Sequence, residues 1–318
     1  MGKSGPSWAL GESADRVKAP KFYIDLPVTT RAIVLMTCSA FSYALTYATI
    51  RELTESFSVF QLVLFRTAIG TAVMLPWVCR SGAGVLRTTR WRLYGIRAVA
   101  VYTGNLCWFY ALAYIALADA TALSFLAPLF TVLILALWVR EDLSGARLTA
   151  FFLGLAGAFV IIRPGFAEVG MATISMLYTT VVYGGATAVT RVLAKTENPN
   201  AVVFYMFALN LPLALGPGIY HWTAPSPSTW LLIGAFAILS LYSQIFLTRS
   251  LALAESAVVM PSFYLQLPLA ALFGFFLFGQ VPEVWLIPGA ALIIGGSYYS
   301  IWSESRRRRA AAEARGVK

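Results

Sequence analysis

The sequence predicts an all-α membrane protein in which ten transmembrane helices form two inverted five-helix repeats. Three observations predict this class: the apolar composition, ten apolar stretches of helix length, and residues that recur at a fixed spacing. Of the 318 residues, 59% are hydrophobic and 12% are charged, and the mean hydropathy is +0.73. A soluble domain has about 25% charged residues. This chain therefore lacks the polar side chains needed to cover a water-exposed surface.

Ten stretches are long and apolar enough to cross a membrane, for which a helix needs about 20 residues. Apolar residues are continuous along each stretch and do not alternate with polar ones, which favours helices over the strands of a barrel. The fifth stretch is the shortest. We expect helices at approximately Ala32–Ile50, Ser58–Cys79, Gly95–Ile115, Ala120–Val139, Leu148–Ile162, Val169–Ala194, Ala201–Tyr220, Trp230–Thr248, Ser256–Phe278 and Val284–Trp302.

The two halves of the chain share residues at a nearly constant spacing, which indicates an internal duplication. In the first part of each half the spacing is 140 residues, and in the later part it is 139, so we expect one deleted residue after Pro268. The matched pairs are Tyr43 with Tyr183, Arg51 with Arg191, Pro128 with Pro268, Glu141 with Gln280, Ala150 with Gly289, and Gly157 with Gly296.

The basic residues gather on one side of the predicted membrane, and the positive-inside rule makes that side cytoplasmic. The opposite side has only Arg51 and Arg163. Both termini are then cytoplasmic, and the net charge of +10 is explained without a nucleic-acid partner. The cytoplasmic set is Lys3, Arg16, Lys18, Lys21, Arg31, Arg80, Arg87, Arg90, Arg92, Arg140, Arg147, Arg191, Lys195, Arg249, Arg306 to Arg309, Arg315 and Lys318.

Five helices per repeat is an odd number, so the two halves insert with opposite orientations. We expect a cytoplasmic arm at 1–30, repeats at 31–163 and 164–303, and a basic cytoplasmic tail at 304–318. Inverted repeats are typical of secondary transporters, whose substrate site lies at the repeat interface near the membrane midplane. Such a repeat supplies its own symmetry, so a monomer is sufficient.

The chain resembles the drug/metabolite transporter superfamily, specifically the ten-helix type with two EamA-like repeats. The resemblance implies export of amino acids or related metabolites, or transport of nucleotide sugars, triose phosphates, vitamins or small cations. Aromatic amino-acid exporters of the YddG type are similar in general plan. Gln280 departs from the pattern, since the family often has Glu there. The residues that carry the resemblance are Phe65-Arg66, Ala111-Leu112, Pro128-Leu129-Phe130, Glu141, Gly157, Pro268-Leu269, Gly279-Gln280, Gly289 and Gly296.

Aromatic and amide side chains at mid-membrane depth form the predicted substrate site. Tyr102, Asn105 and Trp108 lie at three-residue steps on one helical face. Two alternatives stay open: Asn105 as an interhelical hydrogen-bonding residue and Trp108 as part of the interfacial aromatic belt. The full predicted set is Tyr43, Tyr47, Arg66, Tyr102, Asn105, Trp108, Tyr183, Gln244, Tyr264 and Gln266.

Arg66 is the charged residue placed deepest within a predicted span, where an unpaired guanidinium is costly. It either makes a structural bond to helix-end carbonyls, Glu52 or Glu55, or it contacts a substrate carboxylate. Three prolines inside predicted spans each remove a backbone bond and are candidate kinks or hinges. They are Pro128, Pro261 and Pro268.

These residues predict a secondary transporter that exports a small metabolite, an amino acid or a related compound, across the inner or plasma membrane. An exchanger or an uptake carrier for a vitamin or nucleotide-like compound is the alternative, ahead of a channel or an intramembrane enzyme. One histidine, three unpaired cysteines and no Gly-x-x-x-x-Gly-Lys loop predict no metal, no cofactor and no ATP-driven step. The acidic residues lie outside the spans or at their edges, which favours facilitated diffusion or exchange over proton coupling.

Overall fold

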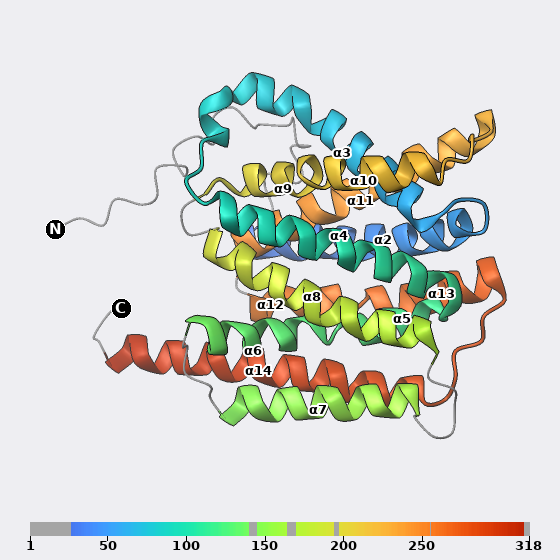
Figure 1. Ribbon diagram of the computed structural model, residues 1–318. Helices are drawn as coiled ribbons and strands as arrows, with labels where there is room; N and C mark the ends of the chain where they lie inside the picture. The colour runs from blue at the N-terminus through green and yellow to red at the C-terminus, as the bar shows by residue number, and fades with distance from the viewer. Residues whose placement is uncertain (1–26, 140–144, 164–169, 194–196, 255, 315–318) are drawn as a thin grey trace.

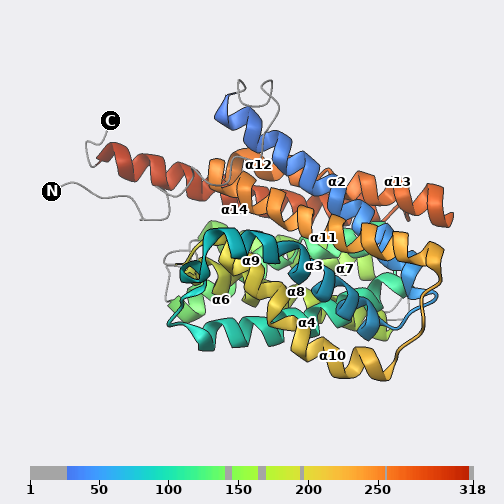
Figure 2. The same cartoon turned by 90° about the horizontal axis from the view of Figure 1, so that it is seen from above.

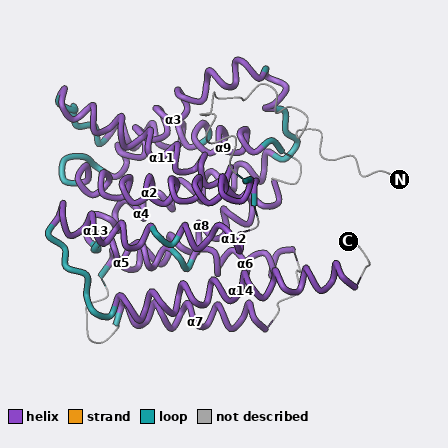
Figure 3. Tube along the Cα trace, turned by 180° about the vertical axis from the view of Figure 1, so that it is seen from behind, coloured by secondary structure: helices purple, strands orange, loops and turns teal. Residues whose placement is uncertain are grey.

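The computed structural model describes residues 27–139, 145–163, 170–193, 197–254 and 256–314. These residues form helices joined by loops, without strands (Figure 3), and the helices lie side by side along one common direction (Figure 1). The elements are α2 (Val28–Thr54), α3 (Val59–Ser81), the 3-10 helix η2 (Ala83–Leu86), α4 (Trp91–Tyr114), α5 (Leu117–Ser124), α6 (Ala127–Val139), α7 (Gly145–Ile162), α8 (Met171–Leu193), α9 (Pro199–Ala208), α10 (Asn210–Tyr220), α11 (Pro227–Leu253), α12 (Ser256–Phe263), α13 (Gln266–Phe278) and α14 (Leu286–Ala314).

These helices make ten passes along the bundle, which confirms the predicted fold class. Seven passes are single helices, and the other three are the pairs α5 with α6, α9 with α10, and α12 with α13. By length and composition, six stretches are apolar enough to cross a membrane, and the shorter helix Leu148–Ile162 is also apolar. The N-terminal arm to residue 26, Glu141 and the last four residues lie outside the described part. Helix α14 continues to Ala314, well past the predicted end at Trp302.

Three spans that the sequence predicted as continuous are each divided in two. Helix α5 ends at Ser124 and α6 begins at Ala127, while α12 ends at Phe263 and α13 begins at Gln266. At the first break, the N–H of Leu126 donates to the carbonyl of Leu123 at 3.0 Å. This short-range bond tightens the backbone into a 3-10 turn and interrupts the α-helical pattern. Apolar composition is the same on both sides of each break, so hydropathy gave no sign of it.

The prolines lie beside these breaks. Pro128 is the second residue of α6 and Pro268 the third of α13, where a helix has no use for the N–H that proline lacks. Pro261 lies inside α12, two residues before its end. The breaks themselves match at a spacing of 139 residues, whereas the two prolines are 140 apart. The helix ends and the prolines therefore differ by one residue, and the position of the slip after Pro268 stays a prediction.

Two similar hydrogen bonds join the two halves reciprocally. The Oγ of Ser39 on α2 donates to the carbonyl of Ser243 on α11 at 2.9 Å. The Oγ1 of Thr179 on α8 donates to the carbonyl of Gly104 on α4 at 3.3 Å. At the spacing of 140 residues Ser39 corresponds to Thr179, and Ser243 lies one residue before the counterpart of Gly104, so each half donates a similar bond to the other. Helices α2 and α11 accordingly pack side by side, as do α4 and α8 (Figure 2).

The contact between α7 and α14 repeats the same symmetry through glycine. A Cβ added at Gly157 would lie 2.5 Å from the carbonyl oxygen of Gly289, and one at Gly296 would lie 2.9 Å from that of Ala150. These four residues are the members of the two pairs that the repeat predicted, and each contacts a member of the other pair. Small side chains let helix backbones approach each other closely in a membrane. The spacing of the glycines therefore reflects packing between the two repeats.

Replacing Gly157 with alanine is expected to lower the melting temperature of the detergent-purified protein. The new methyl group would meet a backbone oxygen, so α7 and α14 must separate, at about 1–3 kcal/mol for an overpacked contact. Gly295→Ala on α14 is the matched control, because a Cβ there meets nothing within 4 Å. Equal melting temperatures for the two variants would contradict this packing.

The loops at one end of the bundle are joined by side chains from several passes. Arg51 at the end of α2 donates to the carbonyls of Leu112 and Ile115 at 3.0 and 2.8 Å, which satisfies the last carbonyls of α4. The Oε1 of Gln280 accepts a bond from the N–H of Leu117 at 3.0 Å. A neutral amide oxygen is therefore sufficient to cap α5 at this position, where the resembling family often has a carboxylate.

Candidate substrate site

Aromatic rings from three passes meet in the interior, beside the break between α12 and α13. The rings of Tyr47 on α2 and Trp108 on α4 lie 4.8 Å apart between centroids, and Tyr43 lies 5.9 Å from both Tyr47 and Phe263. Trp108 is 4% exposed. It packs in the interior of the bundle, so the alternative of an interfacial belt residue is wrong.

The buried guanidinium of Arg66 faces the same region from α3. Its Nε donates to the Oγ of Ser240 on α11 at 2.6 Å, and its Cζ lies 5.3 Å from the ring centre of Phe207. The side chain is 7% exposed, and within the described part of the chain no carboxylate forms an ion pair with it.

The structural partners that the sequence suggested for Arg66 are therefore replaced by a serine hydroxyl and an aromatic face. Neither satisfies the full charge, because a neutral hydroxyl accepts one bond and a ring attracts a cation only through its quadrupole. The guanidinium carries five N–H donors. It is therefore available to an oxygen of a bound solute.

Two amide side chains also reach this interior with unused hydrogen-bonding capacity. The Oδ1 of Asn105 on α4 accepts a bond from the hydroxyl of Tyr183 on α8 at 2.7 Å, but its Nδ2 has no partner among the described residues. Gln266, the first residue of α13, is fully buried near the hydroxyl of Tyr47. Neither its Nε2 nor its Oε1 has a partner within hydrogen-bond geometry in the described part.

The other predicted residues lie around this group with fewer contacts to it. The hydroxyl of Tyr102 is buried and has no partner among the described residues. Tyr264 packs its ring 5.1 Å from that of Phe125 and turns its hydroxyl toward Ser297 of α14. Gln244 is half-buried on α11, and its backbone carbonyl accepts a bond from the Oγ1 of Thr248. For these three residues a role in substrate binding stays a prediction.

Sequence reasoning missed two residues of the interior. Phe207, which lies against Arg66, gave no signal because it is one of many apolar residues in its span. Arg97 on α4 is 8% exposed; its Nε donates to the Oγ1 of Thr190 at 2.7 Å and its Nη1 to the carbonyl of Val202 at 3.3 Å. Its position three residues into a predicted span was the signal that could have identified it. Its bonds join α4 to α8 and α9.

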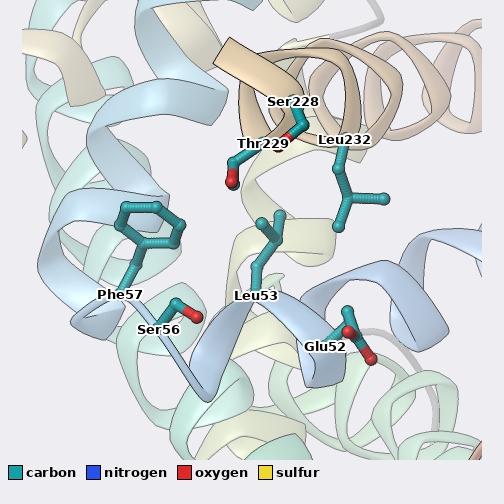
Figure 4. Close-up of a pocket in the computed structure, with 7 residues that line it drawn as sticks. All are labelled: Glu52, Leu53, Ser56, Phe57, Ser228, Thr229 and Leu232. Carbon is teal, nitrogen blue, oxygen red and sulfur yellow. The ribbon is translucent and has the colours of Figure 1, made fainter. Parts of the chain in front are cut away.

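A depression of about 240 Å³ lies at the end of the bundle where α2 ends and α11 begins (Figure 4). Its walls carry hydroxyl groups and one carboxylate over a leucine floor. Leu53 lies six residues beyond Tyr47 on α2, about 9 Å at the rise of an α-helix. Its lining consists of Glu52, Leu53, Ser56, Phe57, Ser228, Thr229 and Leu232.

The fold and its interior define a ten-helix membrane transporter with inverted repeats, in which polar and aromatic side chains meet where the two halves join. The model of the EamA-like transporter family matches residues 30–163 and 170–302. The chain therefore belongs to the EamA-like transporter family. It is a transporter of a small molecule and not an enzyme.

Curated relatives and a solved structure agree with this assignment. The chain is 30% identical to a riboflavin transporter of Brucella anthropi, over 79% of this chain and 90% of the relative. It is 32% identical to a riboflavin transporter of Rhizobium johnstonii, over 74% and 78%. It is 26% identical to the pseudopaline exporter CntI of Pseudomonas aeruginosa, over 85% and 95%. A crystal structure with 20% identity has a TM-score of 0.60 over 87% of this chain and 98% of that chain, which shows a shared fold.

Proposed function

We propose that the protein is a secondary transporter of a small planar aromatic metabolite, with riboflavin as the first candidate substrate. The observation that carries this proposal is the interior group formed by the Tyr47 and Trp108 rings with two amide side chains that have unpaired atoms in the described part of the chain, Asn105 and Gln266. Aromatic side chains stack against a planar ring, and neutral amides suit an uncharged, hydrogen-bonding heterocycle. The names of the two relatives at 30% and 32% identity support the same substrate.

Counterflow in liposomes tests this substrate. Purified protein is reconstituted in vesicles loaded with unlabelled riboflavin, and entry of labelled riboflavin is followed. We expect saturable entry that depends on internal riboflavin, because a substrate-bound carrier reorients across the membrane faster than an empty one. Labelled flux that neither saturates nor responds to internal riboflavin would contradict a carrier. Wild-type protein that gives no riboflavin flux at all would rule out this substrate.

An aromatic amino acid is the second candidate, and Arg66 is the observation that favours it. Within the described part of the chain this buried cation has no carboxylate partner, and a substrate carboxylate would supply one. Adding tryptophan or phenylalanine to the same counterflow assay separates the two candidates. Competition by the amino acids, with no riboflavin flux, would favour the second.

We propose that net flux follows the solute gradient, so that the protein exports when the internal concentration is higher. Asp119 is a half-buried carboxylate at the third position of α5, near Arg163 and Glu283. A proton-coupled carrier usually holds its carboxylate further inside the membrane. By their names, relatives include both an exporter and an S-adenosylmethionine uptake transporter of Rickettsia prowazekii, 22% identical.

We propose that the end of the bundle where α14 finishes is cytoplasmic. Single cysteines at Glu55 and Glu283, introduced after replacement of Cys38, Cys79 and Cys107, are expected to react with an impermeant thiol reagent added outside cells. A cysteine at Thr88, at the other end, is expected to react only after the membrane is opened. Labelling of the Thr88 cysteine in intact cells would show that the protein has the opposite orientation.

A further inference from the structure

Among the described residues, Gln266 is a buried side chain with two polar atoms that have no hydrogen-bond partner. The residue is 0% exposed, and both its donor Nε2 and its acceptor Oε1 have no partner in the described part of the chain. It is the first residue of α13, directly after the break that follows Phe263. Native proteins leave few buried polar atoms unpaired, so an amide with two of them requires an explanation.

The surroundings of Gln266 indicate that the missing partner is a ligand. The hydroxyl of Tyr47 is close to the amide without completing a hydrogen bond. The ring of Tyr47 in turn lies 4.8 Å from that of Trp108. A planar solute that separates these two rings would therefore bring its edge toward Gln266.

We propose that Gln266 recognises the lactam edge of a planar heterocycle, in which an N–H stands next to a C=O. A primary amide carries a donor and an acceptor side by side, so the two edges form two parallel hydrogen bonds. Nε2 donates to the ring carbonyl, and the ring N–H donates to Oε1. A carboxylate offers only acceptors, so one of its oxygens would face the Oε1 of Gln266 with no proton to form a hydrogen bond. This inference rests on the proposed function, since riboflavin carries such an edge at N3–H and its flanking carbonyls.

The test compares riboflavin with 3-methylriboflavin, which lacks the N3 proton, by quenching of flavin fluorescence on purified protein. The wild type is expected to bind riboflavin at least about tenfold more tightly, the ratio of one lost buried hydrogen bond. In Gln266→Met and Gln266→Leu, this preference is expected to shrink to about twofold or less. Thr37→Val is the matched control, because its exposed hydroxyl bonds only the Ile33 carbonyl of its own helix.

The melting temperature of the ligand-free protein gives a second readout. Gln266→Met removes two unpaired buried polar atoms, so the variant is expected to melt at or above the wild-type temperature. A marked drop would show that Gln266 serves a structural bond and would overturn the proposal. An unchanged preference for riboflavin in both variants would also overturn it. Wild-type protein that binds no riboflavin would instead refute the proposed substrate, and the inference with it.

Discussion

Asn105→Ala is expected to reduce riboflavin counterflow per folded protein at least about tenfold, beyond any loss of melting temperature caused by the broken bond to Tyr183. The Nδ2 of Asn105 has no partner among the described residues, so alanine removes a donor that is free for the substrate. The hydroxyl of Tyr183 loses its acceptor at the same time. Flux per folded protein, from initial rates in liposomes, is the measurement.

Tyr183→Phe separates the two parts of that effect. It removes the hydroxyl that orients the Asn105 carboxamide but leaves the amide in place, so a smaller loss of counterflow is expected. If Asn105→Ala instead lowers the melting temperature and leaves flux per folded protein intact, Asn105 is an interhelical hydrogen-bonding residue. That was the alternative left open by the sequence.

Arg66→Met is expected to lower transport about 10- to 100-fold, more than Asn105→Ala does. Hydrogen bonds from a charged donor are roughly twice as strong as neutral ones. Arg66→Lys is not expected to restore transport. An ammonium lacks the planar fork that binds Ser240 through Nε while the remaining N–H groups face the interior. Initial rates of counterflow, measured with riboflavin and with tryptophan, provide the readout.

Arg249→Met is the control for the loss of one positive charge, since Arg249 is exposed near the end of α11. It is expected to transport at the wild-type rate. Equal transport by Arg66→Met and Arg249→Met would contradict a role for Arg66 in substrate binding. A larger loss for tryptophan than for riboflavin in Arg66→Met would favour a carboxylate as the group that Arg66 contacts.

The fold could be predicted from the sequence because a membrane imposes simple rules on a chain. Each crossing needs a helix of fixed length, and basic residues concentrate on one side. The pairs Ala150 with Gly289 and Gly157 with Gly296 also identified an interface, because close helix packing selects small residues at a regular spacing. In the structure these residues meet across α7 and α14.

The positions of the helix breaks could not be predicted in this way. Both sides of the break between α12 and α13 are apolar, and Pro268 is the third residue of α13. A proline in the first turn of a helix and one in its middle look alike in a sequence of uniform apolarity.

The sequence alone determined the class of this protein, the number of passes and the polar residues that a lipid-facing helix would not carry. Composition and periodicity are properties of each segment, so they need no knowledge of its neighbours. The tertiary structure decided which polar groups are paired. Arg66 meets Ser240 from 174 residues away, and Asn105 meets Tyr183 across 78 residues, while Gln266 meets no partner in the described part of the chain. Hydrogen bonding depends on distances of about 3 Å between groups far apart in the chain, and only the packing of the two inverted halves sets those distances.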